Sequence, residues 1–208
     1  MSKNILAASL LALLASQPAW ADTWHVTVDT STLSGLSGAL DFLFIAADPS
    51  APAATASITA FSSNGVLGAA TPTGDASGNL GSTLVLGNSQ FFNDWLQGFT
   101  FGSTLSFNVD INVPTPNASA SGTAFSLSLY DGSYNSLLAD PVWNAALVIN
   151  ASDDGTMAVL AQSAPVSLAS PVPEPQNALL LLSGLGLIGW RLRKLDQAFP
   201  LRAASSAP

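Results

Sequence analysis

Cysteine is absent from this 208-residue chain, and basic residues are scarce. Without cysteine the chain has no disulfide and no thiol chemistry, so its stability must come from packing and backbone pairing. Only five residues are lysine or arginine, and all five lie outside residues 22–170. That central stretch also lacks glutamate and contains a single histidine, His25.

The central stretch is strongly acidic. It contains eleven aspartates and no lysine or arginine, which gives it a formal charge of −11. A surface without basic side chains releases no counterions from a phosphate backbone and is repelled by anionic headgroups. Nucleic acid and anionic lipid are therefore excluded as partners of this stretch.

The residue types that most hydrolases use are also missing. A Ser-His-Asp triad needs a histidine as general base, and His25 lies in an alternating segment typical of a strand. The sequence contains no G-x-S-x-G elbow and no His/Cys cluster that could hold zinc. A glycosidase needs two carboxylates, and Asp110 is the most notable candidate, but no basic residue or glutamate supports it. We expect a protein that is not an enzyme, with a hydrolase as a distant alternative.

Residues 1–21 are predicted to form a secretory signal peptide. Lys3 supplies the positive charge, residues 5–15 form a short apolar helix, and Pro18 ends it. Ala19 and Ala21 are the small residues that precede a cut before Asp22. An uncleaved anchor is the alternative, although the apolar run is too short to span a bilayer stably. Signal peptidase is thus an expected partner.

The C-terminal end divides into three segments. Residues 164–175 form a Pro-rich linker, residues 176–194 contain an apolar helix and a basic cluster, and residues 195–208 form a polar tail. The apolar helix, residues 178–190, would be about 20 Å long, against about 30 Å of hydrocarbon. It suits a transient inner-membrane segment better than a permanent anchor. The basic cluster would stay cytoplasmic, which leaves the middle domain outside the inner membrane.

The order of these C-terminal parts resembles the PEP-CTERM sorting domain. The motif would consist of Val172, Pro173, Glu174, Pro175, Arg191, Arg193 and Lys194. The resemblance implies recognition by a membrane-embedded exosortase and cleavage near Pro-Glu-Pro, in a Gram-negative bacterium that makes extracellular polysaccharide. Members usually stop at or just after the basic cluster, but 14 more residues follow here. An uncleaved C-terminal anchor is the alternative.

Residues 22–163 are predicted to form an all-β domain, because apolar and polar residues alternate in several short segments. Asp153-Asp154-Gly155 favours a hairpin turn, and residues 90–97 are the one helix-like stretch. The longest segment is either one strand or two strands that bend at Gly102. The predicted strands are residues 24–29, 40–46, 56–61, 82–86, 99–113, 124–130, 144–150 and 156–162. The pattern indicates an antiparallel β-sandwich, with a jelly roll as its more specific form.

The middle domain also resembles a family of PEP-CTERM proteins known only by this shared architecture. The resemblance lies in LSGLSGALDFLF, in LGNSQFFNDWLQGFTFGSTLSFNV, and in FSLSLYDG followed by LLADP. These segments cover most of residues 33–141. The family has no established activity, so the resemblance implies a fold and a context rather than a chemistry.

Two kinds of ligand remain as hypotheses. Asp131, Asp153 and Asp154 supply loop oxygens that could bind Ca²⁺, although they lack the EF-hand spacing and are also ordinary turn residues. Aromatic rings could stack on sugars, and the candidates are Trp24, Trp95, Trp143 and Tyr130. Trp95 is the preferred glycan contact, because it lies in the predicted non-strand stretch.

Two functions follow from these features. The first is a non-catalytic component of the envelope or of a biofilm matrix, associated with exopolysaccharide and located in the periplasm, at the cell surface or beyond. The second is a carbohydrate-binding module. No cofactor other than Ca²⁺ is indicated.

Overall fold

A computed structural model describes residues 22–114 and 121–169 of the chain. The predicted signal peptide, with Ala19 and Ala21, lies outside the described residues. The sorting motif, the apolar helix at 176–194 and the tail at 195–208 also lie outside them. Within the described ranges, no helix has the length and apolarity that crossing a membrane requires.

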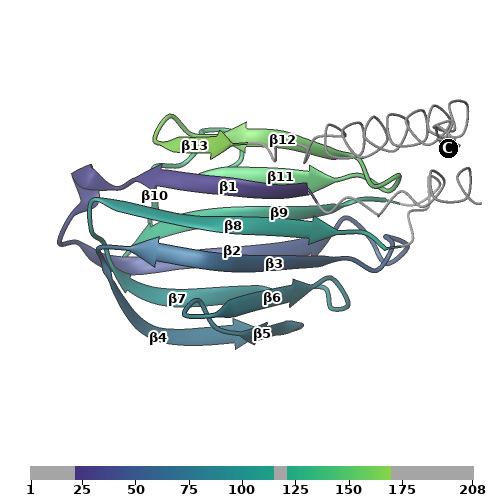
Figure 1. Cartoon of the computed structure of the whole chain (residues 1–208), viewed down its shortest axis with the longest axis horizontal. Coiled ribbons are helices and arrows are strands. Elements are labelled where there is room, and N and C mark those ends of the chain that lie inside the picture. The colour runs from purple at the N-terminus through teal and green to yellow at the C-terminus, as the bar shows by residue number, and fades with distance from the viewer. Residues whose placement is uncertain (1–21, 115–120, 170–208) are drawn as a thin grey trace, which may run out of the picture. The chain divides into compact units, whose positions relative to one another are not determined.

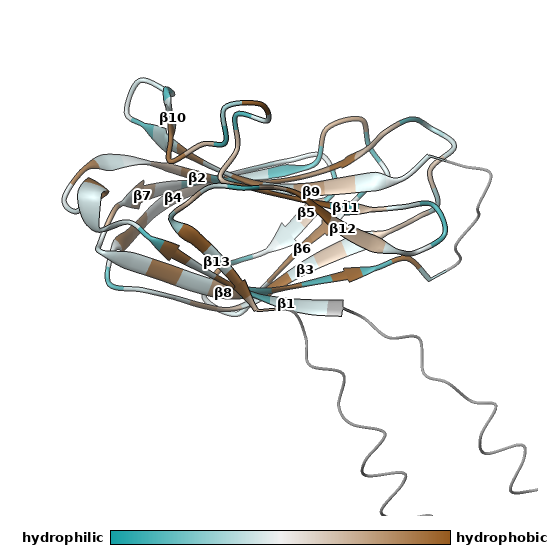
Figure 2. Ribbon diagram, turned by 90° about the horizontal axis from the view of Figure 1, so that it is seen from above, coloured by the Kyte–Doolittle hydropathy of each residue, from teal (hydrophilic) through white to brown (hydrophobic). Residues whose placement is uncertain are grey.

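In the described residues thirteen strands form two antiparallel sheets, which lie as two layers in Figure 2. Along the first sheet the order is β13 (Val166–Ala169), β1 (Asp22–Asp29), β8 (Thr104–Asn112), β3 (Thr55–Ser63), β6 (Thr83–Gly87) and β5 (Ala76–Gly78). Along the second sheet the order is β12 (Met157–Gln162), β11 (Leu147–Ala151), β9 (Thr123–Asp131), β2 (Ser37–Ala46), β7 (Asp94–Thr100) and β4 (Val66–Thr73). The short β10 (Ser136–Leu137) also pairs with β9, and one 3-10 turn, η1 (Ser31–Leu33), joins β1 to β2 (Figure 1).

One large hydrophobic core fills the space between the sheets. In β2 and β8 alternate residues are almost completely buried, as period-two patterning requires. Phe42 of β2 meets Phe107 of β8 edge to face, with ring centroids 5.4 Å apart. These strands belong to opposite sheets, so the aromatic pair joins the two layers. The all-β prediction is confirmed, and the two sheets form a sandwich-like architecture.

Uncharged amides, rather than ion pairs, fix the buried loops of this domain. Asn93 is fully buried and its Nδ2 donates to the carbonyls of Phe44 (3.0 Å) and Gln90 (2.8 Å). Its Oδ1 accepts a hydrogen bond from the backbone N–H of Asp75 at 3.0 Å. A buried amide with its donors and acceptor paired avoids the desolvation cost of a charge. Asn93 thereby joins three separate chain segments.

The helix-like prediction for residues 90–97 is wrong. From Asp94 onward the chain is β7, in which Trp95, Gln97 and Phe99 alternate inward. The short spacing of Phe92, Trp95 and Leu96 imitates a helical face, but pairing with both β2 and β4 favours the strand.

The long segment at residues 99–113 is two strands, as one of the two alternatives proposed. The end of β7 lies in the second sheet and β8 lies in the first, so the chain changes sheets at residues 101–103. Gly102 is buried at this crossing, and a Cβ there would overlap the side chain of Asn64. Glycine is therefore required at residue 102, where the β7–β8 connection lies against the turn that contains Asn64.

The predicted end of the domain at residue 163 is also wrong. Residues 166–169, which were assigned to the Pro-rich linker, form β13 and pair with β1. Val166 is 3% exposed and belongs to the main core. Pro165 lies in the turn before the strand, where its missing N–H costs no ladder hydrogen bond.

Candidate functional site

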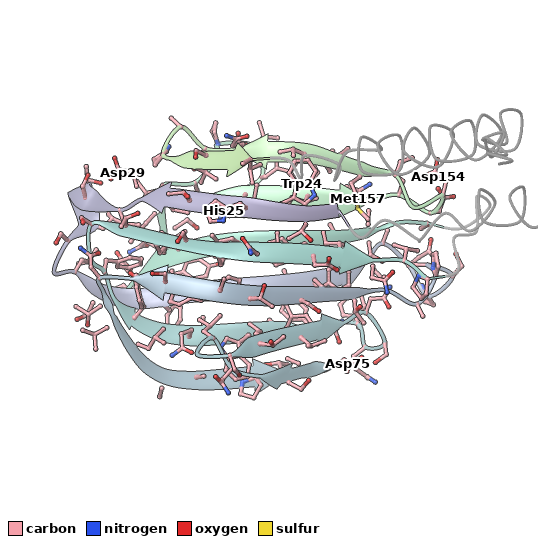
Figure 3. The ribbon with its side chains drawn as sticks, viewed as in Figure 1. Trp24, His25, Asp29, Asp75, Asp154 and Met157 are labelled. Atoms are coloured by element: carbon pink, nitrogen blue, oxygen red, sulfur yellow. The ribbon has the colours of Figure 1, made fainter. Side chains whose placement is uncertain are left out.

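The outer face of the first sheet is polar and its side chains pair locally. His25 Nδ1 lies 2.8 Å from Oδ1 of Asn108, its cross-strand neighbour. Thr23 donates its hydroxyl to Asp110 Oδ2 at 3.1 Å. The two groups considered for catalysis are thus each engaged with an uncharged neighbour. Trp24, on the same strand (Figure 3), packs against the main core instead.

The outer face of the second sheet is different, because a carboxyl group lies at its centre. Asp41 of β2 pairs with Leu96 of β7 on one side and with Ser128 of β9 on the other. Asp94 of β7 pairs with Leu43, which is two residues along β2 from Asp41. Since residues two apart share a face, Asp41 and Asp94 are diagonal neighbours on the outer face.

These two carboxyl groups have incompletely satisfied oxygens. Oδ1 of Asp41 and Oδ1 of Asp94 are buried and have no hydrogen-bond partner. Burial, with a further contribution from the negative charge of Asp94, raises the pKa of Asp41 to about 7. A neutral carboxyl tolerates an unpaired buried oxygen better than a carboxylate does, so the raised pKa is consistent with this geometry.

A hollow of about 310 Å³ lies beside Asp41 on this outer face. Its floor includes Ala39, Gly98 and Ala69, from the adjacent strands β2, β7 and β4. Ala39 and Gly98 are cross-strand partners, and Ala39 precedes Asp41 by two residues on the same face. Three small residues side by side leave room that larger side chains would fill. The space therefore follows directly from the sequence of these strands.

The β9–β10 turn supplies the rim of the hollow through Asp131 and Tyr134. Oδ1 of Asp131 accepts hydrogen bonds from the N–H groups of Ser133 (2.8 Å) and Asn135 (2.9 Å), and Oδ2 accepts one from Asn135 Nδ2 (2.8 Å). These bonds, the Asn135 side chain foremost, lower the pKa of Asp131 below its usual value. Asp131 is therefore ionised at neutral pH.

Tyr134 presents its ring at this rim. It is 66% exposed and has a φ of 61°, in the left-handed region that residues other than glycine seldom adopt. Its ring lies 6.2 Å from that of Tyr130, which is the cross-strand partner of Ala39. The turn thus holds an exposed aromatic ring next to an ionised carboxylate. In Figure 2, β10 and the loop after it rise from the second sheet.

The structure does not place Trp95 where a sugar could contact it. Trp95 is 7% exposed, belongs to the main core, and donates Nε1–H to Gln97 Oε1 at 3.1 Å. The prediction of Trp95 as an exposed glycan contact is wrong, because its segment is a strand rather than a loop. Sequence reasoning missed Tyr134, whose exposed ring lies at the rim of the hollow. Its position directly after Asp131-Gly132-Ser133, a turn sequence, is the signal that could have identified it.

The residues considered for calcium lie in separate turns. Asp131 ends β9, whereas Asp153 and Asp154 lie in the β11–β12 hairpin beside the start of β9. Asp154 Oδ1 accepts hydrogen bonds from the N–H (2.9 Å) and the hydroxyl (2.7 Å) of Thr156. Figure 3 shows Asp154 at the tip of its hairpin. Within residues 22–114 and 121–169, no three His, Cys, Asp or Glu side chains gather as a metal site would require.

Fold and site together define a class: an acidic, sandwich-like β domain with an aromatic-rimmed hollow on one outer face. No family model matches the chain, and no curated protein or solved structure matches it either.

Proposed function

We propose that this chain is an exported, non-catalytic protein of the cell envelope or extracellular matrix. The observation that carries the proposal is the position of the two ends of the domain. Asp22 begins β1 and Ala169 ends β13, and these strands are antiparallel neighbours with Ala169 opposite His25. Both ends therefore leave the domain at the same end of the sandwich (Figure 1). This arrangement suits a domain that crosses the inner membrane behind a signal peptide and is held by its C-terminal segment until that segment is cleaved.

Both predicted processing sites lie directly beside folded strands. Signal peptidase would cut between Ala21 and Asp22, so the mature chain would start at the first residue of β1. The last strand ends at Ala169, shortly before Val172, where the proposed PEP-CTERM motif begins. An exosortase cutting near Glu174 would then release a complete β domain to the periplasm, the cell surface or the matrix.

A jelly roll is the finer fold class that we propose. In the sheets β1 pairs with β8, β2 with β7, and β3 with β6. This nested order is what results when one long antiparallel hairpin wraps around a barrel. Jelly rolls include lectin domains, but fold alone does not assign a function.

A non-catalytic role associated with exopolysaccharide fits the surface of the domain. The described residues contain no lysine or arginine, and their one histidine contacts an amide. The outer face of the first sheet carries paired polar side chains, and the hollow of the second sheet is floored by small ones, as is suitable for a hydrated matrix. A carbohydrate-binding module is the second candidate, and the hollow beside Tyr134 is the observation that favours it. A hydrolase stays a distant alternative.

Mass spectrometry of the protein recovered from its host tests the proposal. We expect a mature N-terminus at Asp22 and a C-terminus close to Pro175, without residues 195–208. A Glu174→Gln variant changes only the charge of the sorting motif and should accumulate with its C-terminal segment retained. Recovery of the intact 208-residue chain from the soluble cell interior would contradict the proposal.

A further inference from the structure

The proposed export and sorting make no use of the hollow on the second sheet, yet the hollow combines three features of a ligand site. Its volume, about 310 Å³, is at the lower end of the range for small-molecule sites. Its floor of small residues is open, and its rim holds an exposed tyrosine ring and a carboxylate. An exposed aromatic ring beside polar groups is a suitable surface for the face of a sugar ring.

The negative charge around the hollow restricts which charge a bound glycan can carry. Asp131 is ionised at the rim, and Asp94 lies two rows farther along the same outer face. Asp41, one row away, is mostly neutral below its pKa of about 7. No lysine or arginine occurs in residues 22–169, so no side-chain cation offsets these charges. A glycan carrying carboxylate, sulfate or phosphate groups would be repelled. A glycan that carries an ammonium group would be attracted.

Asp131 keeps one acceptor position for such a group. A carboxylate offers about four lone-pair positions, and the turn uses three of them. The remaining position is on Oδ2, which accepts only the hydrogen bond from Asn135. Because the turn fixes the carboxylate, a ligand ammonium would meet an oriented partner and a charge-assisted hydrogen bond could form.

We propose that this hollow binds an amino-sugar unit with a free, protonated amine, within a polysaccharide chain. In this arrangement the ring of Tyr134 packs on the sugar face, Asp131 pairs with the ammonium group, and the Ala39–Gly98–Ala69 floor admits the ring. The inference rests on the proposed function, because export brings the hollow to a polysaccharide. It adds to that function the class of sugar that is recognised.

Calorimetric titration of the full-length protein with a glucosamine oligomer of about five units, at pH about 6, provides the test. The fully N-acetylated oligomer of the same length is the comparison ligand, because acetylation removes the positive charge by converting each amine to an acetamide, while the sugar rings and their linkages stay the same. We expect binding of the free amine form and at least roughly tenfold weaker binding of the acetylated form, as for loss of a charge-assisted hydrogen bond.

Two variants remove one ligand contact each while keeping the two backbone hydrogen bonds that Asp131 Oδ1 accepts in the turn. Asp131→Asn keeps an oxygen that can accept from Ser133 and Asn135 but loses the charge. Tyr134→Asn removes the ring with a residue that tolerates positive φ. Each should weaken binding roughly tenfold.

Two control variants match these changes at positions away from the hollow. Asp154→Asn is the control for loss of a turn carboxylate. Phe91→Asn is the control for loss of an exposed ring, since Phe91 is 89% exposed and does not line the hollow. Both controls should bind like the wild type.

A third variant blocks the space. Ala69→Leu puts a larger side chain on an exposed edge-strand position of the floor and should abolish binding while leaving the melting temperature unchanged. Equal binding of the acetylated oligomer, or equal losses in the two control variants, would overturn the inference. So would binding of a lysine oligomer that depends on Asp131 but not on Tyr134, because that result would show general charge attraction. Failure here leaves the mass-spectrometric test of export and sorting unaffected.

Discussion

At the scale of single residues, Asp41 makes the stability of the domain depend on pH. Its pKa is raised from 3.8 in the unfolded reference to about 7, mainly by burial. Between these values the folded state binds more protons than the unfolded state, so the free energy of unfolding falls as pH rises. A shift of about three units corresponds to about 4 kcal/mol at most. Most acidic groups that are hydrogen-bonded in the native state have the opposite effect.

We therefore expect the wild-type protein to be less stable at pH 8 than at pH 5, by up to a few kcal/mol. Asp41→Asn replaces the carboxyl with a neutral group of similar shape, so it should remove most of this slope and be more stable than wild type at pH 8. Urea unfolding at a series of pH values measures both effects.

The control for this pH series is Asp154→Asn. Hydrogen bonds from Thr156 lower the pKa of Asp154, so its own contribution is complete above its unfolded pKa and does not vary between pH 5 and 8. Its slope should equal that of the wild type. The same slope in Asp41→Asn and wild type would show that burial of Asp41 does not destabilise the folded protein at high pH.

At the scale of elements, β13 determines where the folded domain ends. Its Val166 is buried in the main core, and the strand covers the edge of β1. A chain that stops at residue 163 should lose the burial of Val166 and four residues of pairing. We expect a loss of roughly 2–4 kcal/mol and exposure of the β1 edge, which favours aggregation. A chain that stops at residue 171 should melt like the longer protein.

Thermal unfolding and light scattering of the two truncated proteins measure this difference. Both start at Asp22, so only the C-terminal end changes. Equal melting temperatures and equal solubility would mean that β13 is dispensable and that a domain boundary at residue 163 is adequate.

Strands with one buried face could be predicted from the sequence, whereas the exposed edge strand β4 could not. Strands with clear alternation, such as β2 and β9, were predicted within a few residues, because one face of each enters the core. The edge strand β4 is exposed along its whole length, so it has no alternating pattern to detect. Its ladder shifts register between Leu67 and Ala70, and it contains Pro72, two features that discourage pairing with another chain. The edge is thus protected without the lysines that many proteins place there.

The residues of the candidate site were also only partly predictable, because local patterns are visible in the sequence and contacts between distant strands are not. Asp131 was considered only as a weak calcium ligand, from its turn. In the structure it lines the hollow, and its oxygens mainly hold the turn together. Asp41 could not be recognised, since its environment depends on strands that are far apart in the sequence. Trp95 was misassigned because the period of a short apolar run does not separate helix from strand.

At the scale of the whole molecule, the folded domain stands out because its acidic residues have no lysine or arginine beside them. Residues 22–169 contain eleven aspartates and no lysine or arginine, so the folded domain has repulsion that is not offset by ion pairs. Several of these aspartates instead accept hydrogen bonds within their own turns, as Asp48 does from Ser50 and Asp140 does from Val142. Those bonds orient the carboxylates but leave their long-range repulsion in place.

Salt should therefore stabilise this protein. Raising NaCl from about 0.01 M to about 0.3 M shortens the screening length from about 30 Å to less than 10 Å. The repulsion falls, and we expect the melting temperature at pH 7.5 to rise by a few degrees. Differential scanning calorimetry checks this, and a lower melting temperature in salt would mean that attractive charge pairs dominate.

Comparing the effects of CaCl₂ and MgCl₂ on the melting temperature separates general charge screening from binding at a specific calcium site. Asp131 and Asp154 each belong to a different turn and direct their oxygens to that turn, so neither offers the six to eight oxygen ligands that Ca²⁺ prefers. We expect CaCl₂ and MgCl₂ at equal concentration to raise the melting temperature equally, since both act through charge alone. A larger effect of Ca²⁺ that EDTA reverses would contradict this expectation and indicate a calcium site. Asp131→Asn and Asp154→Asn would then identify the turn that holds the ion, because only the variant of the ligating turn would lose the additional stabilisation.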